Sequence, residues 1–203
     1  MHELKGPAVP CGLTGIRADL QTWFTVAGAE GTWDRVRVVL DSPALWAMAL
    51  YRFGRWLRDP NVRRPRLVAK ALWPVYRLLW PLSLWLTRVF LTVDSEVEGD
   101  VWIGSFDSTW IGSGARLERG VRIHGGVTLG LGGRGERRGV PHLGRDVTLA
   151  PGVVLVGKIH VADGAVVAAN GSSAKSIEGS GGHLGAPLVP FSGAPLNLVP
   201  LPT

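Results

Sequence analysis

Several residue types are scarce in this chain of 203 residues, which has one cysteine, Cys11, two methionines and two tyrosines. A single cysteine excludes both an intramolecular disulfide framework and a metal site built from cysteine ligands, so we expect no bound metal. Long apolar runs are also missing. In the most apolar stretch, Arg77 and Arg88 leave ten residues between them, well short of the roughly 20 that span a bilayer. The chain also begins without the apolar core of a signal peptide, which predicts a cytoplasmic protein.

Acidic residues and glycine are scarce in the first part of the chain. Residues 1–93 carry 13 Lys+Arg and 6 Asp+Glu, whereas residues 94–203 carry 9 and 10, so balances of +7 and −1 give the net charge of +6. Glycine has the opposite distribution, with 6 residues in the first part and 22 in the second. The basic balance alone would suggest a polyanion or an anionic surface as partner. No nucleic-acid-binding motif accompanies it, however, and the charge lies in segments of buried character, so we expect no nucleic acid partner.

Residues 1–93 are predicted to form an N-terminal helical segment that packs against the rest of the protein or mediates oligomerisation. Ser42 and Pro43 are typical of a helix start, because serine caps and proline suits the first helical position. In the run that follows, Arg52, Arg55 and Arg58 form one polar stripe on a largely buried helix. Residues 1–32 show weak periodicity and indicate a loop or a short helix.

A second helix is predicted from about Arg66 to Thr92, with bends at Pro74 and Pro81. Its many apolar residues favour a helix buried in a subunit interface. Tryptophan together with arginine is also typical of helices that lie on a membrane surface, which leaves a weak membrane-surface association as the alternative.

A six-residue period runs through residues 94–171, which we predict to be a repeat domain. The aliphatic positions of this period are Val97, Ile103, Ile111, Leu117, Ile123, Leu129, Leu143, Leu149, Leu155, Val161 and Val167. Small or β-branched residues recur four positions later, and glycine often occupies the intermediate turn. Three short strands per coil would stack these aliphatic residues into one buried column. The fold class is therefore mainly β, a parallel β-helix of hexapeptide repeats, which is left-handed in the families that have such coils.

Two steps of the period are irregular. The step from Ile103 to Ile111 is one hexad plus two residues, and the step of fourteen from Leu129 to Leu143 corresponds to two hexads plus two. The second contains a glycine- and arginine-rich segment, which predicts a flexible, basic excursion loop over residues 130–142. Loops that leave a rigid scaffold often carry function.

Residues 172–203 form a Gly/Pro-rich apolar tail with no charged residue after Glu178. Such a tail should lie along its own β-helix or along a neighbour's, because it would otherwise expose a large apolar surface.

The segment VRIHGGVTLGLGGRGERRGVPHLGRDVTLAPGVVLVGKIHVADGAVVAANGSS resembles the serine O-acetyltransferases, a family of hexapeptide-repeat acyltransferases. The ALYRFGRWL run in the helical segment and VPFSGAPLNLV in the tail are also similar to that family. The resemblance implies an O-acetyltransferase that uses acetyl-CoA or another acyl-CoA. It also implies a homotrimer or dimer of trimers, with sites between neighbouring β-helices and a hydroxylated small molecule, an amino acid or sugar-like compound, as acceptor.

The resemblance further implies a catalytic histidine that is oriented by a carboxylate and takes the proton of the acceptor hydroxyl. Aligned on VTLG, that histidine position is Ser105, with Asp107 two residues later, and Asp94 resembles the orienting carboxylate. His124, on the next coil and diagonal to Ser105, is a candidate replacement base, and His142 after the excursion loop is another. A serine alone cannot act as base near neutral pH. The alternative is therefore a catalytically weakened homologue that serves as a trimeric scaffold or regulatory subunit.

The acyl-CoA site implied by the resemblance combines glycines and arginines of the excursion loop with small residues of later coils. Its predicted members are Gly130, Gly132, Gly133, Arg134, Arg137, Arg138, Ala150, Pro151, Gly152, Ala168 and Ala169. The arginines are suited to neutralise phosphates, and the small residues would let the pantetheine arm approach the β-helix.

Overall fold

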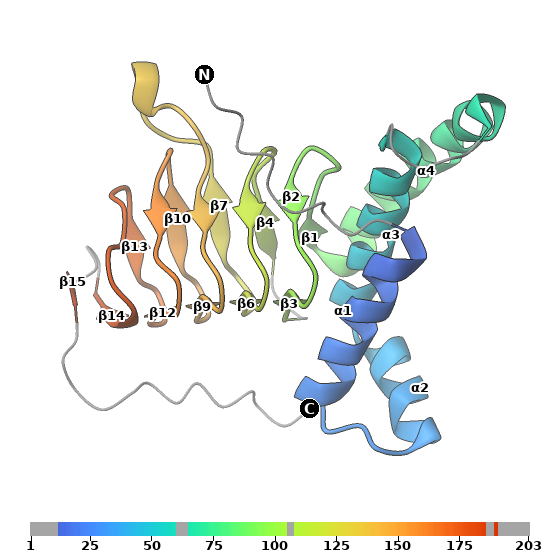
Figure 1. Ribbon diagram of the computed structural model, residues 1–203, viewed down its shortest axis with the longest axis horizontal. Coiled ribbons are helices and arrows are strands. Elements are labelled where there is room, and N and C mark those ends of the chain that lie inside the picture. The colour runs from blue at the N-terminus through green and yellow to red at the C-terminus, as the bar shows by residue number, and fades with distance from the viewer. Residues whose placement is uncertain (1–11, 60–64, 105–107, 186–188, 191–203) are drawn as a thin grey trace.

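The protein consists of a helical region followed by a parallel β-helix, as the computed structural model shows (Figure 1). The structure describes residues 12–59, 65–104, 108–185 and 189–190. The helices within these ranges are α1 (Gly12–Val26), α2 (Thr32–Asp41), α3 (Pro43–Arg58) and α4 (Arg66–Thr87). They stand together at one end of the β-helix.

The strands of the β-helix form three faces, each a sheet of stacked strands. Face A contains β1 (Val89–Phe90), β4 (Thr109–Ile111), β7 (Thr128–Gly130), β10 (Val154–Val156) and β13 (Ser172–Ser173). Face B contains β2 (Glu96–Val97), β5 (Arg116–Leu117), β8 (His142–Leu143) and β11 (His160–Val161). Face C contains β3 (Trp102–Ile103), β6 (Arg122–Ile123), β9 (Thr148–Leu149), β12 (Ala165–Val167), β14 (Gly181–Leu184) and β15 (Val189–Pro190). Among the described strands every pairing is parallel except that of β14 with β15, which confirms the predicted β-helix.

The predicted aliphatic positions form the core of the β-helix. All of them, from Val97 to Val167, have an exposed fraction of 0%. Register places them directly above one another, for example Ile111 on Leu129. Each such side chain contributes roughly 1.5–3 kcal/mol through burial, so the column of aliphatic residues is the main source of stability of this part.

The strand register shows where the extra residues of both irregular steps lie. The pairing of β4 with β7 defines a regular coil of three hexads. Ile103 pairs with Ile123, which makes a longer coil, so the extra length lies between β3 and β4, as predicted. Leu117 pairs with Leu143 across the excursion, so the whole excursion is inserted into a single hexad step. The interpretation of this step as two hexads plus two was wrong, because β7 and β8, which bound it, lie on consecutive faces.

The helical region holds more helix than the sequence predicted. Helix α3 begins at Pro43 as expected, although the Ser42 side chain makes no capping hydrogen bond. Most of residues 12–41 is also helical. Helix α4 ends at Thr87 rather than near Thr92, because Arg88 adopts a left-handed conformation with φ of 56°. The next two residues already form β1, which pairs with β4, so the β-helix begins at Val89. Of the helices that the structure describes, none is both long and apolar enough to cross a membrane.

Helix α3 closes the open end of the β-helix at face B, where β2 is the edge strand. The hydroxyl of Tyr51 donates a hydrogen bond to the carbonyl of Ser95 (2.8 Å) and accepts one from the amide of Val97 (3.1 Å). Arg52 donates to the carbonyl oxygens of Val97 and Glu98, both at 2.6 Å. An edge strand buried without such donors would leave costly unsatisfied backbone groups, so α3 completes the first coil.

A fully buried ion pair holds this closure in place. Arg52 has an exposed fraction of 0% and Asp19 of α1 of 1%, and they form two hydrogen bonds of 2.8 and 3.0 Å. Burial raises the pKa of Asp19, while Arg52 acts against the rise. Arg52 therefore belongs to the core, whereas Arg58 at the end of the same predicted stripe is half exposed.

We predict that Arg52→Met lowers the free energy of unfolding by about 3–5 kcal/mol, because it leaves the Asp19 carboxylate buried without its cation. Urea denaturation followed by tryptophan fluorescence measures this loss. Arg58→Met is the matched control, since it breaks a pair whose side chains are 52% and 54% exposed and should cost no more than about 1 kcal/mol. Equal losses for the two variants would contradict this account of the closure.

Candidate active site

The predicted site residues lie along two edges of the β-helix. We call the turns that lead from face A to face B the A–B edge, and those that lead from face C to face A the C–A edge. Asp94 and the excursion loop lie on the A–B edge, and His142 is the first residue of the strand that follows it. His124 follows β6 and lies on the C–A edge. Ser105 and Asp107 lie outside the described residues.

His142 forms a hydrogen-bonded pair with a carboxylate. Its Nε2 atom is 2.9 Å from Oε1 of Glu118, and both side chains are partly buried, with exposed fractions of 35% and 24%. Because an ionised carboxylate only accepts hydrogen bonds, Nε2 carries the proton in neutral His142, and Nδ1 is the acceptor. A histidine held in one tautomer by a carboxylate is the arrangement that general-base chemistry uses.

Further polar residues surround this pair on face B. The ring of His160, stacked one coil further on, lies 5.0 Å from the ring of His142 at an interplanar angle of 67°. Arg145 lies 3.9 Å from the Glu118 carboxylate and 3.4 Å from that of Asp163. The outward side of face B is therefore a column of titratable side chains next to the excursion loop.

Glu118 was missed by sequence reasoning, although it makes the carboxylate–histidine contact that was expected of Asp94. The residue lies far before His142 in the sequence, and their proximity follows only when the whole excursion is known to occupy a single hexad step. With that register, Arg116 stacks on His142 and brings Glu118 within reach of the ring.

Asp94 has a different set of contacts. Its carboxylate pairs with Arg58 at the end of α3 and accepts a hydrogen bond of 3.5 Å from the Ser113 hydroxyl. It thereby ties the helical region to the A–B edge. Among the described residues, no hydrogen bond joins Asp94 to His124 or His142.

A groove of about 410 Å³ lies beside Asp94, between α3, α4 and the first coil. Its lining combines two arginines and one carboxylate with aromatic side chains. These residues are Arg58, Arg77, Asp94, Trp73, Tyr76 and Trp80. Burial, followed by the nearby Asp94 charge, raises the pKa of Tyr76 to about 12, so the phenol stays protonated and can donate a hydrogen bond at neutral pH. The volume falls in the range of small-molecule sites.

His124 is half-buried at the C–A edge and lies edge-on to Trp102, with ring centroids 5.2 Å apart. Burial lowers its pKa, and the positive charge of Arg122 lowers it further, so the imidazole is neutral at pH 7. No carboxylate among the described residues contacts it. His124 is thus chemically able to accept a proton but is not oriented as His142 is.

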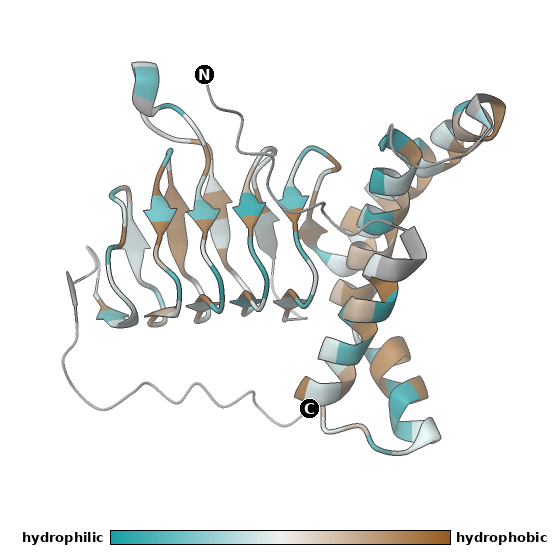
Figure 2. Ribbon diagram, viewed as in Figure 1, coloured by the Kyte–Doolittle hydropathy of each residue, from teal (hydrophilic) through white to brown (hydrophobic). Residues whose placement is uncertain are grey.

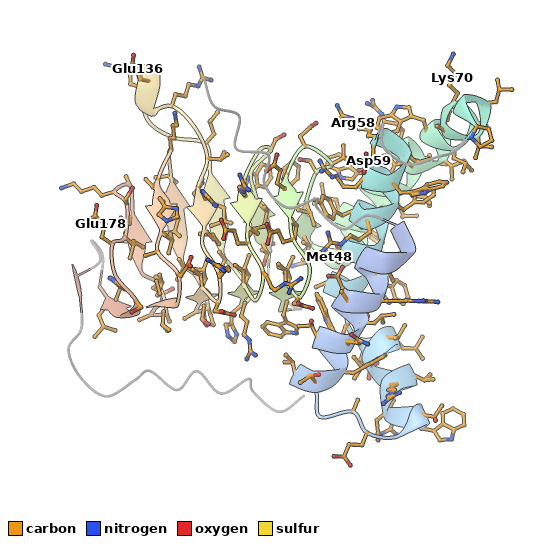
Figure 3. The ribbon with its side chains drawn as sticks, viewed as in Figure 1. Met48, Arg58, Asp59, Lys70, Glu136 and Glu178 are labelled. Carbon is orange, nitrogen blue, oxygen red and sulfur yellow. The ribbon has the colours of Figure 1, made fainter. Side chains whose placement is uncertain are left out.

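The excursion loop is a hairpin within the described residues. Gly132 and Gly139 form an antiparallel bridge at its base, and Gly135–Arg137 form a helical turn at its outer end, where Glu136 is labelled in Figure 3. A side chain at Gly132 would come within 2.9 Å of the backbone nitrogen of Gly157, so this glycine serves close packing on the next coil.

The other residues of the excursion loop that were predicted to bind acyl-CoA differ in exposure and backbone conformation. Arg134 and Arg138 are exposed, whereas the side chain of Arg137 lies outside the described part of the structure. Gly130 ends β7, and Gly133 has a φ of 83° that favours glycine. The loop therefore presents at least two guanidinium groups to solvent beside face B.

The small residues predicted to line the acyl-CoA site lie on the C–A edge, whereas the excursion loop lies on the A–B edge. Ala150 and Ala168 stack beyond His124 along the C–A edge, linked by backbone hydrogen bonds from one coil to the next. Gly152 has a φ of 74°, and a side chain there would collide with that of Asn170, so only glycine fits. Pro151 and Ala169 are exposed. Within one chain, the cationic loop and the strip of small residues are therefore on different edges.

The comparisons with known proteins show the fold. No family model matches the chain, and no curated protein matches its sequence. Among solved structures, the serine acetyltransferase (CysE) of Neisseria gonorrhoeae matches with a TM-score of 0.68 and 18% identity, over 88% of this chain and 65% of that one. The soybean serine acetyltransferase apoenzyme gives 0.68 and 18%, over 87% and 69%. A serine acetyltransferase solved in complex with CoA gives 0.63 and 20%, over 87% and 68%.

This chain thus spans about two thirds of the length of those structures. At this level of identity the likeness shows the fold, a left-handed β-helix with an N-terminal helical region, of the kind found in serine acetyltransferases. The predicted fold class is confirmed.

We predict that an NMR titration finds the pKa of His124 below the ordinary 6.5, and that Arg122→Gln raises it by removing a neighbouring cation. Because the unfolded chain binds this proton more tightly, the free energy of unfolding contributed here should fall as the pH drops below about 6.5. Arg116→Gln on face B is the control and should leave the titration of His124 unchanged. A pKa at or above the ordinary value in the wild type would contradict the placement of His124.

Proposed function

We propose that the protein is an acyl-CoA-dependent O-acetyltransferase that transfers an acetyl group to a hydroxyl of a small metabolite. The observation that carries this proposal is the His142–Glu118 pair at the root of a cationic loop, on a β-helix of the serine acetyltransferase fold. Similar structures were solved with CoA, with serine and with cysteine, which supports a thioester donor and an amino acid or sugar-like acceptor.

In the proposed mechanism His142 is the general base. Glu118 accepts a hydrogen bond from the Nε2–H group of His142, which leaves Nδ1 as the proton acceptor. Nδ1 takes the proton of the acceptor hydroxyl while the hydroxyl oxygen attacks the thioester carbonyl carbon. A new carbon–oxygen bond forms and the carbon–sulfur bond breaks. The protonated imidazole then returns its proton to the departing thiolate. Glu118 stabilises the imidazolium between these two transfers.

The cationic loop supplies the donor site. Arg134 and Arg138 are exposed on the excursion loop, and Lys158 packs against its base at Gly139. Guanidinium groups bind phosphate oxygens through charge-assisted hydrogen bonds, so this group of cations suits the polyphosphate of an acyl-CoA. The strip of small residues at Ala150 and Ala168 suits the narrow pantetheine arm.

The acceptor is proposed to bind beside His142, where its hydroxyl can reach Nδ1. Asp94 lies two residues before β2, and His142 begins β8, two coils further on. At about 4.8 Å per coil, these positions are about 10 Å apart along the axis. The groove beside Asp94 is therefore too far from His142 for one small amino acid to bind in the groove and present its hydroxyl to the base.

The division of the site between two edges supports a homotrimer. Residues on different edges of one β-helix can meet only across an interface between copies. In a cyclic, head-to-tail arrangement the A–B edge of one copy faces the C–A edge of the next. In a three-fold assembly the excursion loop of one copy can reach the C–A edge of the next. The same contact would bring His124 close to the donor site, which keeps it as the second candidate base.

The scaffold alternative depends on one feature, Ser105 at the position where the resemblance to serine O-acetyltransferases implies a catalytic histidine. A protein that kept the fold but had lost the base would bind partners without turnover. The assays below separate this alternative from the enzyme.

We predict that His142→Ala lowers kcat/KM by about 10²- to 10⁴-fold, the usual contribution of a general base. The measurement is thiol release from acetyl-CoA with a panel of amino acids and sugars. His160→Ala is the comparison variant and should lower kcat/KM much less, because His160 is exposed and has no carboxylate contact in the described residues, although its ring lies against that of His142. If only His124→Ala abolishes turnover, His142 is not the base. Acetyl-CoA binding without turnover in the wild type would favour the scaffold, and no binding at all would exclude the acyltransferase.

We predict that replacing Arg134 and Arg138 together by glutamate raises KM for acetyl-CoA at least about tenfold with little change in kcat. The difference from wild type should shrink at high salt, because exposed charges are screened. Arg37→Glu, an exposed arginine of α2, is the matched control for a charge reversal elsewhere. An unchanged KM in the double variant would remove the loop from the donor site.

A further inference from the structure

Helix α4 has two unlike sides. One side packs against α3 and the first coil through Tyr76, which is buried, with partly buried Leu72, Trp73 and Trp80 beside it. The opposite side is exposed and apolar. The helix extends away from the β-helix, with Lys70 at its outer part in Figure 3, so this side is accessible without any movement of the β-helix.

The exposed side is a continuous apolar surface, which we call the outer face of α4. Its large members are Leu67, Val75, Leu78, Leu82, Trp85 and Leu86. At 100° per residue these positions fall within a sector of about 100°. Three of them are about four-fifths or three-quarters exposed, namely Leu67 (79%), Leu78 (75%) and Trp85 (79%). Hydrophobic colouring runs along this helix in Figure 2.

The charges beside this face have one sign. Lys70 and Arg77 are exposed and border the outer face on one side. From Pro60 to Arg88 the sequence contains six Lys+Arg and no Asp or Glu. Helix α2 provides a contrast within the same protein. Its exposed Trp33 lies among acidic and basic residues, so its surface has no such bias.

We propose that the outer face of α4 binds the surface of an anionic lipid bilayer. Apolar side chains including tryptophan, flanked by cations, are what a helix needs to lie in the boundary between headgroups and acyl chains. The described helices are too short or too polar to cross a bilayer, so α4 binds in the plane of the membrane.

Charge favours the membrane over a second copy of the chain. If two outer faces packed together, Lys70 and Arg77 of both copies would flank the contact, and α4 has no carboxylate to offset them. An anionic lipid surface supplies the missing negative charge over the whole length of the helix. The proposal is independent of the proposed catalytic pair, His142 and Glu118, which lies on the β-helix.

The test is flotation of the full-length protein with vesicles. Vesicles of phosphatidylcholine and phosphatidylglycerol in equal parts should carry the protein upward, whereas vesicles of phosphatidylcholine alone should carry much less, and salt should weaken the binding. Replacing Leu78 and Trp85 together by glutamine should reduce vesicle affinity about tenfold or more, because both side chains lose apolar contact. Trp33→Gln, which alters an equally exposed tryptophan (81%) on α2, should bind as the wild type does.

A second variant tests the proposal even if the first variant does not fold. Lys70→Glu leaves the apolar residues intact and should weaken binding to anionic vesicles only. Failure of the wild type to float with anionic vesicles would overturn the proposal. A drop in oligomer mass in the Leu78/Trp85 variant, seen by sedimentation velocity together with unchanged flotation, would instead identify the outer face as an interface between copies.

Discussion

A β-helix must satisfy the backbone groups of its first coil, and in this protein the rest of the structure depends on how α3 does so. The guanidinium of Arg52 joins three parts of the chain, because it binds two carbonyl groups of the first coil and the carboxylate of Asp19. A buried charge is tolerated only when it is paired and hydrogen-bonded, so α1, α3 and the first coil must be assembled together. The first coil then sets the register on which each later coil is stacked.

The β-helix could be predicted from sequence because its information is local and repeated. Each aliphatic residue from Val97 to Val167 marks one strand, and the period alone implies the stacking. The closure could not be predicted in the same way. Arg52 and Arg58 belong to one stripe in the sequence, yet one is buried and the other half exposed. Their partners distinguish them, because Arg52 binds Asp19 and two carbonyl groups of the first coil, whereas Arg58 pairs with Asp94 at the surface.

The candidate site was predictable in residue type but not in pairing. His142 and His124 stood out as histidines near a glycine-rich loop. The carboxylate beside His142 proved to be Glu118, whose distance in sequence depends on the length of the excursion. Asp94, which resembled the orienting carboxylate, is engaged by Arg58. The strand register therefore decides which carboxylate lies beside which histidine. The six-residue period does not predict this register where a loop interrupts it.

The last strand pair of face C has a consequence for the behaviour of the protein in solution. Parallel coils that stack without limit resemble a growing fibre, and an exposed parallel edge is a template for the end of another molecule. Here β15 runs antiparallel to β14, so the final hydrogen-bonding pattern on this face differs from that of every coil before it. A further parallel coil would not find the register it needs there. The reversal of one short strand therefore leaves no parallel edge on face C for another coil to stack on.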